Sequence, residues 1–314
     1  MFINSVQTNS AALAALQALD QTEQALQQTQ QQVSTGYAVN SSADNAGYFS
    51  IATQLKSDSG VVGASNAALA QSEAVLTTAN SAITSILTTI SSIQTALTQA
   101  NNPGANLGQI NTTLQSLGSE LTDAVSGASF NGLNLLDGSQ GGTAGQGATT
   151  TALNFVSGYN ATTTGGTINT ISLSLTALVA NATTGVTSGV LTNATDNGTD
   201  ALAGTTYDLT TIGTGANAVT TSNVQSLLNA VNSAQSTLTD YTATIGTTQD
   251  RMQNATNLNS ALQTNYANGV SALIDADMNQ ASTRLQALQT QQQLGIQSLS
   301  IANQNSQLIL KLFP

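Results

Sequence analysis

The side chains that most enzymes use for nucleophilic or metal chemistry are scarce in this sequence. It contains no histidine and no cysteine, which excludes Ser-His-Asp and Cys-His catalysis, histidine-based zinc sites and thiolate metal sites. Among the acidic residues, Asp275 and Asp277 are close in sequence. On a helix their carboxylates would point to different sides and could not share a proton or a metal ion. We therefore interpret them as solvated surface groups.

Two further segments resemble ion-binding loops only superficially. Residues 196–200 read DNGTD, but they lack the ligand spacing of a calcium-binding EF-hand loop, so a turn is the favoured interpretation. The glycines of segment 141–147 have no lysine after them and indicate a flexible linker, not a phosphate-binding loop. Asn-x-Ser/Thr triplets at Asn160, Asn181 and Asn193 leave glycosylation open. The sequence therefore predicts no catalytic, cofactor-binding or metal site, and no enzyme.

The charge distribution argues against nucleic acids and membranes as partners. The net charge is −11, and the four basic residues are Lys56, Arg251, Arg284 and Lys311. A phosphate backbone or an anionic membrane surface requires clustered Lys or Arg. No apolar run approaches the length of a bilayer span. We expect neither nucleic-acid binding nor membrane insertion.

The elements that could carry a function are long helices. Charged residues make up 6% of the 314 residues and aromatic residues 4%, which favours narrow helix interfaces over a large globular core. From residue 274 to 313, apolar side chains recur at alternating steps of four and three, and a flanking row recurs every seven residues. Such spacing predicts an α-helix that buries a narrow seam against other helices. This C-terminal seam consists of Ile274, Met278, Leu285, Leu288, Leu299 and Ile309, with Leu294, Ile301 and Leu308 in the flanking row.

A weaker seam lies near the N-terminus. Leu19, Leu26 and Val33 repeat every seven residues, with Leu16 beside them, and this helix should end at Gly36 because glycine is favoured just past a helix end. Ordering a residue costs roughly 1–2 kcal/mol in backbone entropy, and a buried apolar side chain returns roughly 1.5–3 kcal/mol. Neither terminal seam finds a sufficient partner within one chain. We expect both to fold against neighbouring copies.

Three more helices are predicted between the ends. Apolar residues repeat every seven positions from Leu69 to Leu97, a break follows at 102–104 (NPG), and helical spacing returns from Leu107, which predicts an antiparallel helical hairpin. A last helix is predicted from Val224 onward.

The segment from Ser139 to about Thr221 is rich in Gly, Thr, Ala and Asn. Residues 171–179 alternate as a half-buried strand does. Shorter strand candidates are 152–156, 190–192, 205–209 and 218–220. A small β-rich insertion fits this pattern, and a disordered Thr-rich linker is the competing interpretation.

Residues 33–55 follow the pattern S-G-x-x-[IV]-N-S-A-x-D-[DN]-A-A-G-x-x-I-A, with departures at Ala38, at an extra Ser42 and at Tyr48-Phe49. Residues 130–138 (FNGLNLLDG) match F-N-G-x-x-L-L-x-G. These stretches and residues 300–312 resemble bacterial flagellin. The resemblance covers roughly 135 residues at the start and 90 at the end. The motif residues are Gly36, Asn40, Ser41, Asp44, Asn45 and Gly47 in the first stretch and Phe130, Asn131, Gly132, Leu135, Leu136 and Gly138 in the second.

The resemblance implies a mainly α fold: a long antiparallel helical bundle or coiled coil formed by the N- and C-terminal regions, with a small β-rich central insertion. Residues 1–40 with 273–314 would form inner terminal helices, residues 41–138 with 223–272 a helical rod domain, and residues 139–222 a solvent-facing variable insertion.

The implied function is that of a structural subunit that polymerises into the flagellar filament for motility. The implied partners are further copies of the chain, an export chaperone, and the cap and hook-junction proteins. The location would be the extracellular flagellum, reached by type III export, and the start MFINSVQTNS lacks the features of a cleaved signal peptide. A hook–filament junction protein, or a secreted adhesin that uses the insertion, are the alternatives.

Overall fold

The computed structural model describes residues 9–140, 152–162, 165–179, 189–195 and 205–312. The chain divides into two compact units. Unit 1 contains residues 1–60 and 263–314, and unit 2 contains residues 61–262. The long helices α2 (Ala46–Ala100) and α4 (Val224–Ile274) contribute to both. The fold is mainly α with small antiparallel sheets in the middle of the sequence, which confirms the predicted fold class.

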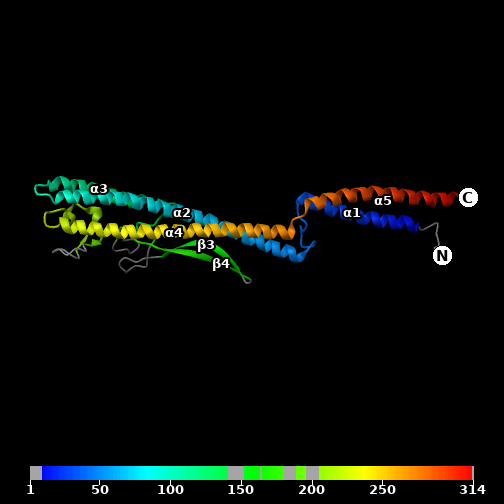
Figure 1. The fold of residues 1–314 in the computed structure, drawn as a ribbon, viewed down its shortest axis with the longest axis horizontal. Coiled ribbons are helices and arrows are strands. Elements are labelled where there is room, and N and C mark those ends of the chain that lie inside the picture. The colour runs from blue at the N-terminus through cyan, green and yellow to red at the C-terminus, as the bar shows by residue number, and fades with distance from the viewer. Residues whose placement is uncertain (1–8, 141–151, 163–164, 180–188, 196–204, 313–314) are drawn as a thin grey trace. The chain divides into compact units, whose positions relative to one another are not determined.

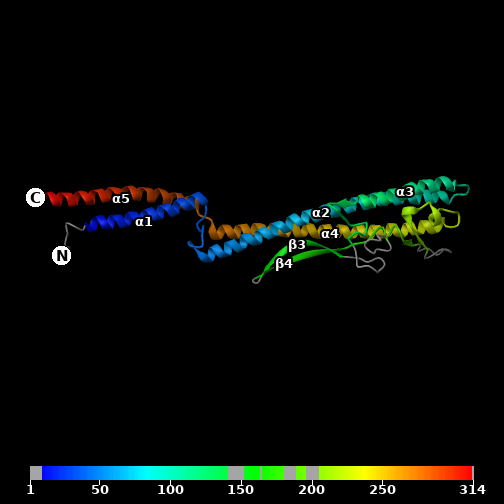
Figure 2. The same cartoon turned by 180° about the vertical axis from the view of Figure 1, so that it is seen from behind.

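Unit 1 is built on an antiparallel pair of helices. α1 (Ser10–Thr35) and α5 (Met278–Leu312) lie side by side in both views (Figures 1 and 2). A Cβ at Gly295 would lie 3.2 Å from Cδ1 of Leu19, so the glycine permits close approach of the two helices. The Asn9 side chain accepts a hydrogen bond from the Ala12 N–H and donates one to the Ala302 carbonyl. It therefore caps α1 and ties its start to α5.

Unit 2 has one continuous core shared by α2, α3 (Leu107–Gly127), α4 and the strands. The seven-residue row from Leu69 to Leu97 is almost fully buried, as its spacing predicts. α2 ends at Ala100, a turn containing Pro103 follows, and α3 begins at Leu107, which confirms the helical hairpin.

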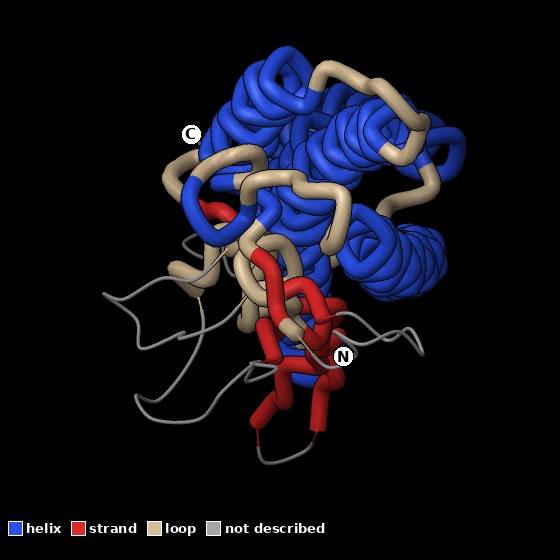
Figure 3. The backbone as a smooth tube through the Cα atoms, turned by 90° about the vertical axis from the view of Figure 1, so that its left-hand side faces the viewer, coloured by secondary structure: helices blue, strands red, loops and turns tan. Residues whose placement is uncertain are grey.

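In the described residues, three two-stranded antiparallel sheets follow α3. Figure 3 shows the strands gathered on one side of the helices. The longest sheet carries a bulge between Val156 and Gly158, and the buried Asn259 side chain of α4 donates to the Ser157 carbonyl there, at 3.0 Å. The sheets are β1 (Ser129–Phe130) with β2 (Leu133–Asn134), β3 (Ala152–Thr162) with β4 (Gly165–Ser174), and β5 (Ala194–Thr195) with β6 (Thr206–Tyr207).

The strand predictions are partly wrong. The alternating strand predicted over 171–179 ends at Ser174, residues 190–192 form a turn, and residues 218–220 are not a strand. After β6 the chain forms two short 3-10 helices, η1 (Leu209–Thr211) and η2 (Gly215–Asn217), which return it to the helical core.

The insertion is not a detached appendage in its described parts. Leu173, Leu178 and Leu209 are fully buried in the core of unit 2. A Cβ at Gly118 of α3 would lie 2.7 Å from the Thr210 carbonyl oxygen, so only glycine fits beneath η1. Nearby, the Asn111 side chain donates to the Val219 carbonyl and accepts from the Val219 N–H. Apolar burial and these hydrogen bonds attach the insertion firmly to the helices.

Candidate assembly surface

The C-terminal seam divides into two rows with different environments. We call the residues spaced by three and four that face α1 the inner row and the flanking seven-residue row the outer row. In the outer row, Leu294 is 60% exposed and Ile301 57% exposed. Ile296, elsewhere on α5, is also exposed. The inner-row residues, buried or half-buried, are Ala281, Leu285, Leu288, Gln292, Gly295, Leu299 and Ala302.

Exposed leucines also lie on α1. Leu13 and Leu16 are exposed, whereas Leu19 and Val33 are half-buried and Leu26 is buried. Unit 1 thus presents large apolar side chains from both terminal helices that the single chain does not cover. Several exposed large apolar side chains on one helix pair favour an interaction surface.

Two buried threonines of α1 lie outside the apolar residues of the N-terminal seam. Thr22 and Thr29 are buried, and their hydroxyls donate to the carbonyls of Ala18 and Ala25 at 2.8 Å. Each threonine satisfies its hydroxyl on its own helix, so it can occupy a buried position much as valine would. Sequence reasoning missed both residues because it counted only apolar types.

The prediction of one continuous helix from residue 274 onward is wrong. Ile274 is the last residue of α4, Met278 is the first of α5, and residues 275–277 are not helical. Ile274 is buried in a small cluster with Val39 and Ala52, and does not belong to the α5 seam. Met278 is largely exposed.

The two aspartates of this break have structural roles. The Asp277 carboxylate accepts hydrogen bonds from the backbone N–H groups of Asn279 and Gln280, at 2.9 and 3.2 Å, and so caps α5. Asp275 accepts from the Ser271 hydroxyl and its backbone is bridged to Tyr37. Both aspartates are exposed, as the sequence analysis expected, although they lie in the break and not within a helix.

The first flagellin-like motif forms the connection between α1 and α2. Gly36 ends α1 with a positive φ of 75°, as predicted for a C-terminal glycine. Asp44 accepts hydrogen bonds from the backbone N–H groups of Asn40 and Ser41 at 3.0 and 2.9 Å. Asn45 accepts from the N–H of Gly47 at 3.1 Å and from that of the next residue, and so caps α2.

Removing the Asp44 carboxylate should loosen this connection. The pKa of Asp44 is lowered by hydrogen bonds, first from the N–H of Asn40 and then from the side chain and the N–H of Ser41. Burial opposes them only weakly. Because the pKa in the folded chain lies below that in the unfolded chain, the stabilisation is present above pH 3.8 and is lost as the pH falls through the folded value.

In Asp44→Ala, we expect amide hydrogen exchange at Asn40 and Ser41 to accelerate by about tenfold or more at neutral pH. Ser41→Ala, which leaves both backbone bonds in place, is the matched control. Unchanged exchange in Asp44→Ala would contradict this role.

The second motif forms the β1–β2 turn of unit 2. Asn131 and Gly132 have positive φ values of 52° and 78°, as a two-residue hairpin turn requires. Leu135 and Leu136 are buried in the core, Phe130 is partly exposed, and Gly138 has a φ of 71°. The buried Asn134 side chain donates to the Val125 carbonyl at 2.7 Å and fixes the turn against α3. This motif maintains unit 2 and contributes nothing to the surface of unit 1.

Several predictions of the sequence analysis lie outside the described residues. They concern the side chains of Leu308 and Ile309, whose backbone is helical, the glycines of segment 141–147, and residues 196–200. Among the residues that the structure describes, no group of three metal-ligating side chains is found, and no helix has the length and apolarity to cross a membrane.

Comparison with known proteins agrees with the motifs. The family model for the bacterial flagellin N-terminal helical region matches residues 6–141, and that for the C-terminal helical region matches residues 200–313. The chain is 37% identical to Flagellin C of Rhizobium meliloti (strain 1021), with 99% of both chains covered. It is 36% identical to a flagellin of Brucella melitensis biotype 1, with 98% of this chain and 99% of the relative covered. Flagellin FljM of Caulobacter vibrioides is 30% identical over the full length of both chains. The chain therefore belongs to the bacterial flagellins, the structural subunits of the flagellar filament.

Proposed function

We propose that the α1–α5 pair of this filament subunit is its assembly element. The observation that carries the proposal is the outer row of α5, whose Leu294 and Ile301 are mostly exposed, together with Leu13 and Leu16 of α1. Burying a large apolar side chain stabilises by roughly 1.5–3 kcal/mol relative to leaving it exposed. Contact with neighbouring copies would bury these side chains and stabilise the terminal helices at the same time.

The arrangement of residues in the filament is part of the same proposal. Residues 1–40 and 273–314 would form the inner tube, residues 41–138 and 223–272 the surrounding helical layer, and residues 139–222 the outer insertion. The firm attachment of the insertion to α3 and α4 supports an outer segment that is rigid at its base.

The role in the cell is structural, without an enzymatic step. Self-assembly into the extracellular filament follows from the family. The proposal includes export by the flagellar type III route without cleavage of a signal peptide. It also includes binding to an export chaperone and contacts with the cap and hook-junction proteins.

Deleting residues 295–314 tests the assembly element. We expect a monomer in which unit 2 stays folded and has the same thermal unfolding temperature as in the intact chain, because none of the deleted residues belongs to the unit 2 core. The truncated chain should not elongate filament seeds, since the end of the outer row and the partner of Leu19 are gone. Circular dichroism of thermal unfolding and light scattering of seeded growth measure the two effects. Long filaments from the truncated chain would refute the proposal.

A further inference from the structure

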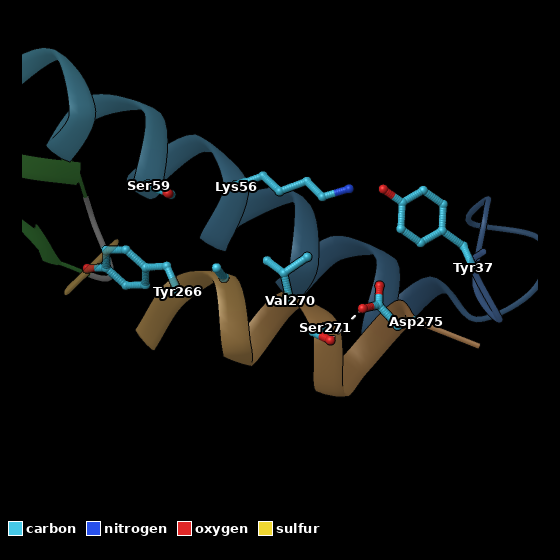
Figure 4. A pocket seen from close by; sticks show the side chains of 8 residues that line it. Tyr37, Lys56, Ser59, Tyr266, Val270, Ser271 and Asp275 are labelled. Atoms are coloured by element: carbon cyan, nitrogen blue, oxygen red, sulfur yellow. Dashed lines mark hydrogen bonds between the residues drawn. The ribbon is translucent and has the colours of Figure 1, made fainter. Parts of the chain in front are cut away.

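A pocket in unit 1 is lined by the exposed cation Lys56, which forms no ion pair with any residue that the structure describes. Its volume is about 340 Å³, and its lining comes from the α1–α2 connection, from α2, from the last turns of α4 and from the break after α4. Figure 4 shows Lys56 reaching from α2 toward the ring of Tyr37, with Asp275 on another side of the pocket. Tyr266 and Ser271 of α4 also line the pocket.

The ammonium group of Lys56 has an aromatic neighbour in place of an ionic one. Its Nζ lies 5.0 Å from the centroid of the Tyr37 ring, within the range of a cation–π contact. Within the described residues, no carboxylate lies at ion-pair distance from Nζ. Asp275, which lines the same pocket, instead accepts the Ser271 hydroxyl. The cation is therefore held in place by a ring face and remains available to an anion.

The composition of the chain makes such a cation unusual. Acidic residues outnumber basic ones by 15 to 4, and no basic residue lies between Lys56 and Arg251. Copies of a chain with a net charge of −11 repel one another at close distance. A Lys placed in a pocket offers a position where a carboxylate of another copy gains attraction, so the charges of two copies are complementary at this point.

We propose that the Lys56–Tyr37 pocket receives an acidic side chain of a second copy of this chain when subunits associate. The incoming carboxylate would accept a hydrogen bond from the Lys56 ammonium. Asp275 would accept a hydrogen bond from an N–H group of the same incoming segment. This second contact would favour an acidic residue within a polar segment over a free anion. The inference deepens the proposed function, on which it rests, by naming one specific contact between copies.

Zero-length cross-linking of filaments tests this contact directly. Filaments are grown from an equal mixture of ¹⁴N- and ¹⁵N-labelled chains and treated with a water-soluble carbodiimide, which joins Lys amines to nearby carboxylates. We expect cross-linked peptide pairs in which Lys56 of one isotope is joined by an amide bond to an Asp or Glu of the other isotope. We expect no such mixed-isotope pairs when monomers are treated in the same way. Absence of mixed-isotope Lys56 pairs, or Lys56 pairs within single copies only, overturns the inference.

Substitutions give a second, independent result. Lys56→Gln should raise the critical concentration for seeded elongation by about tenfold, whereas Lys56→Arg, which keeps the charge and the cation–π contact, should stay close to the wild type. Equal critical concentrations for Lys56→Gln and the wild type would overturn the inference while wild-type growth still upholds the proposed function. Failure of the wild-type chain to elongate seeds at all would instead refute the proposed function.

Discussion

Replacing Leu294 and Ile301 with glutamine is expected to raise the critical concentration for filament elongation by about a hundredfold. In the single chain both side chains of this outer row are more than half exposed, so the substitutions should cost the monomer little. In the filament, loss of two partly exposed apolar groups from a buried contact should cost roughly 2–3 kcal/mol, and each 1.4 kcal/mol corresponds to about tenfold. Seeded growth followed by light scattering at a series of subunit concentrations measures the change.

Two matched variants show whether the outer row itself is responsible. Gln289→Ala with Asn303→Ala changes exposed polar side chains of α5 outside the outer row and should alter the critical concentration far less. Leu285→Gln with Leu288→Gln changes the inner row, and should lower the helix content of the monomer as well as elongation, because these residues face α1. An outer-row variant that grows like the wild type would show that these side chains stay exposed in the filament.

The terminal seams show how far periodicity alone can predict an interface. The residues that the step of three and four selects on α5, from Leu285 to Leu299, are half-buried, and Gly295 among them lies against Leu19 of α1. The same apolar spacing could not show that Leu294 and Ile301 remain exposed, because a row of apolar residues looks alike whether its partner is in the same chain or in another. On α1, Thr22 and Thr29 were missed since their burial depends on a local hydrogen bond to the helix backbone.

The break between α4 and α5 could not be predicted from the sequence, for another reason. Residues 275–277 contain no proline or glycine, so the sequence offers no conventional stop signal there. The break depends on tertiary pairing: Ala38 N–H donates to the Ile274 carbonyl at 2.7 Å, and Ala276 N–H to the Gly36 carbonyl at 2.8 Å. Distant backbone groups thus replace the hydrogen bonds that a continuous helix would make. Only the folded chain brings these segments together.

The sequence also could not predict the pocket at Lys56 or the environment of the Tyr241 hydroxyl. The pocket is lined from segments far apart in sequence, such as Tyr37, Lys56 and Asp275. Tyr241 of α4 is buried, with an exposed fraction of 4%. Whether its hydroxyl finds a hydrogen-bond partner depends on the loop that covers it, and spacing carries no information on this.

Burial of Tyr241 should make unit 2 less stable at alkaline pH. Burial raises its pKa from 10.0 to about 12, although the backbone of Thr176 acts in the opposite direction. The hydroxyl forms no hydrogen bond of normal geometry within the described residues. As the pH rises, the unfolded chain loses this proton first. The contribution to stability is therefore complete below pH 10 and is lost between pH 10 and 12.

Comparison of the wild type with Tyr241→Phe isolates this effect. At pH 11 the free energy of unfolding of the wild type should be about 1 kcal/mol lower than at pH 8 through this residue alone, and the variant should lack that part of the decline. At pH 8 the variant should be as stable as the wild type or slightly more so, because it buries no unpaired hydroxyl. Urea unfolding of the monomer at both pH values measures the difference, and Tyr48→Phe, at an exposed tyrosine of unit 1, is the control for loss of a hydroxyl. Parallel decline of the wild type and Tyr241→Phe between pH 8 and pH 11 would show that the hydroxyl is hydrated or hydrogen-bonded when the chain is folded.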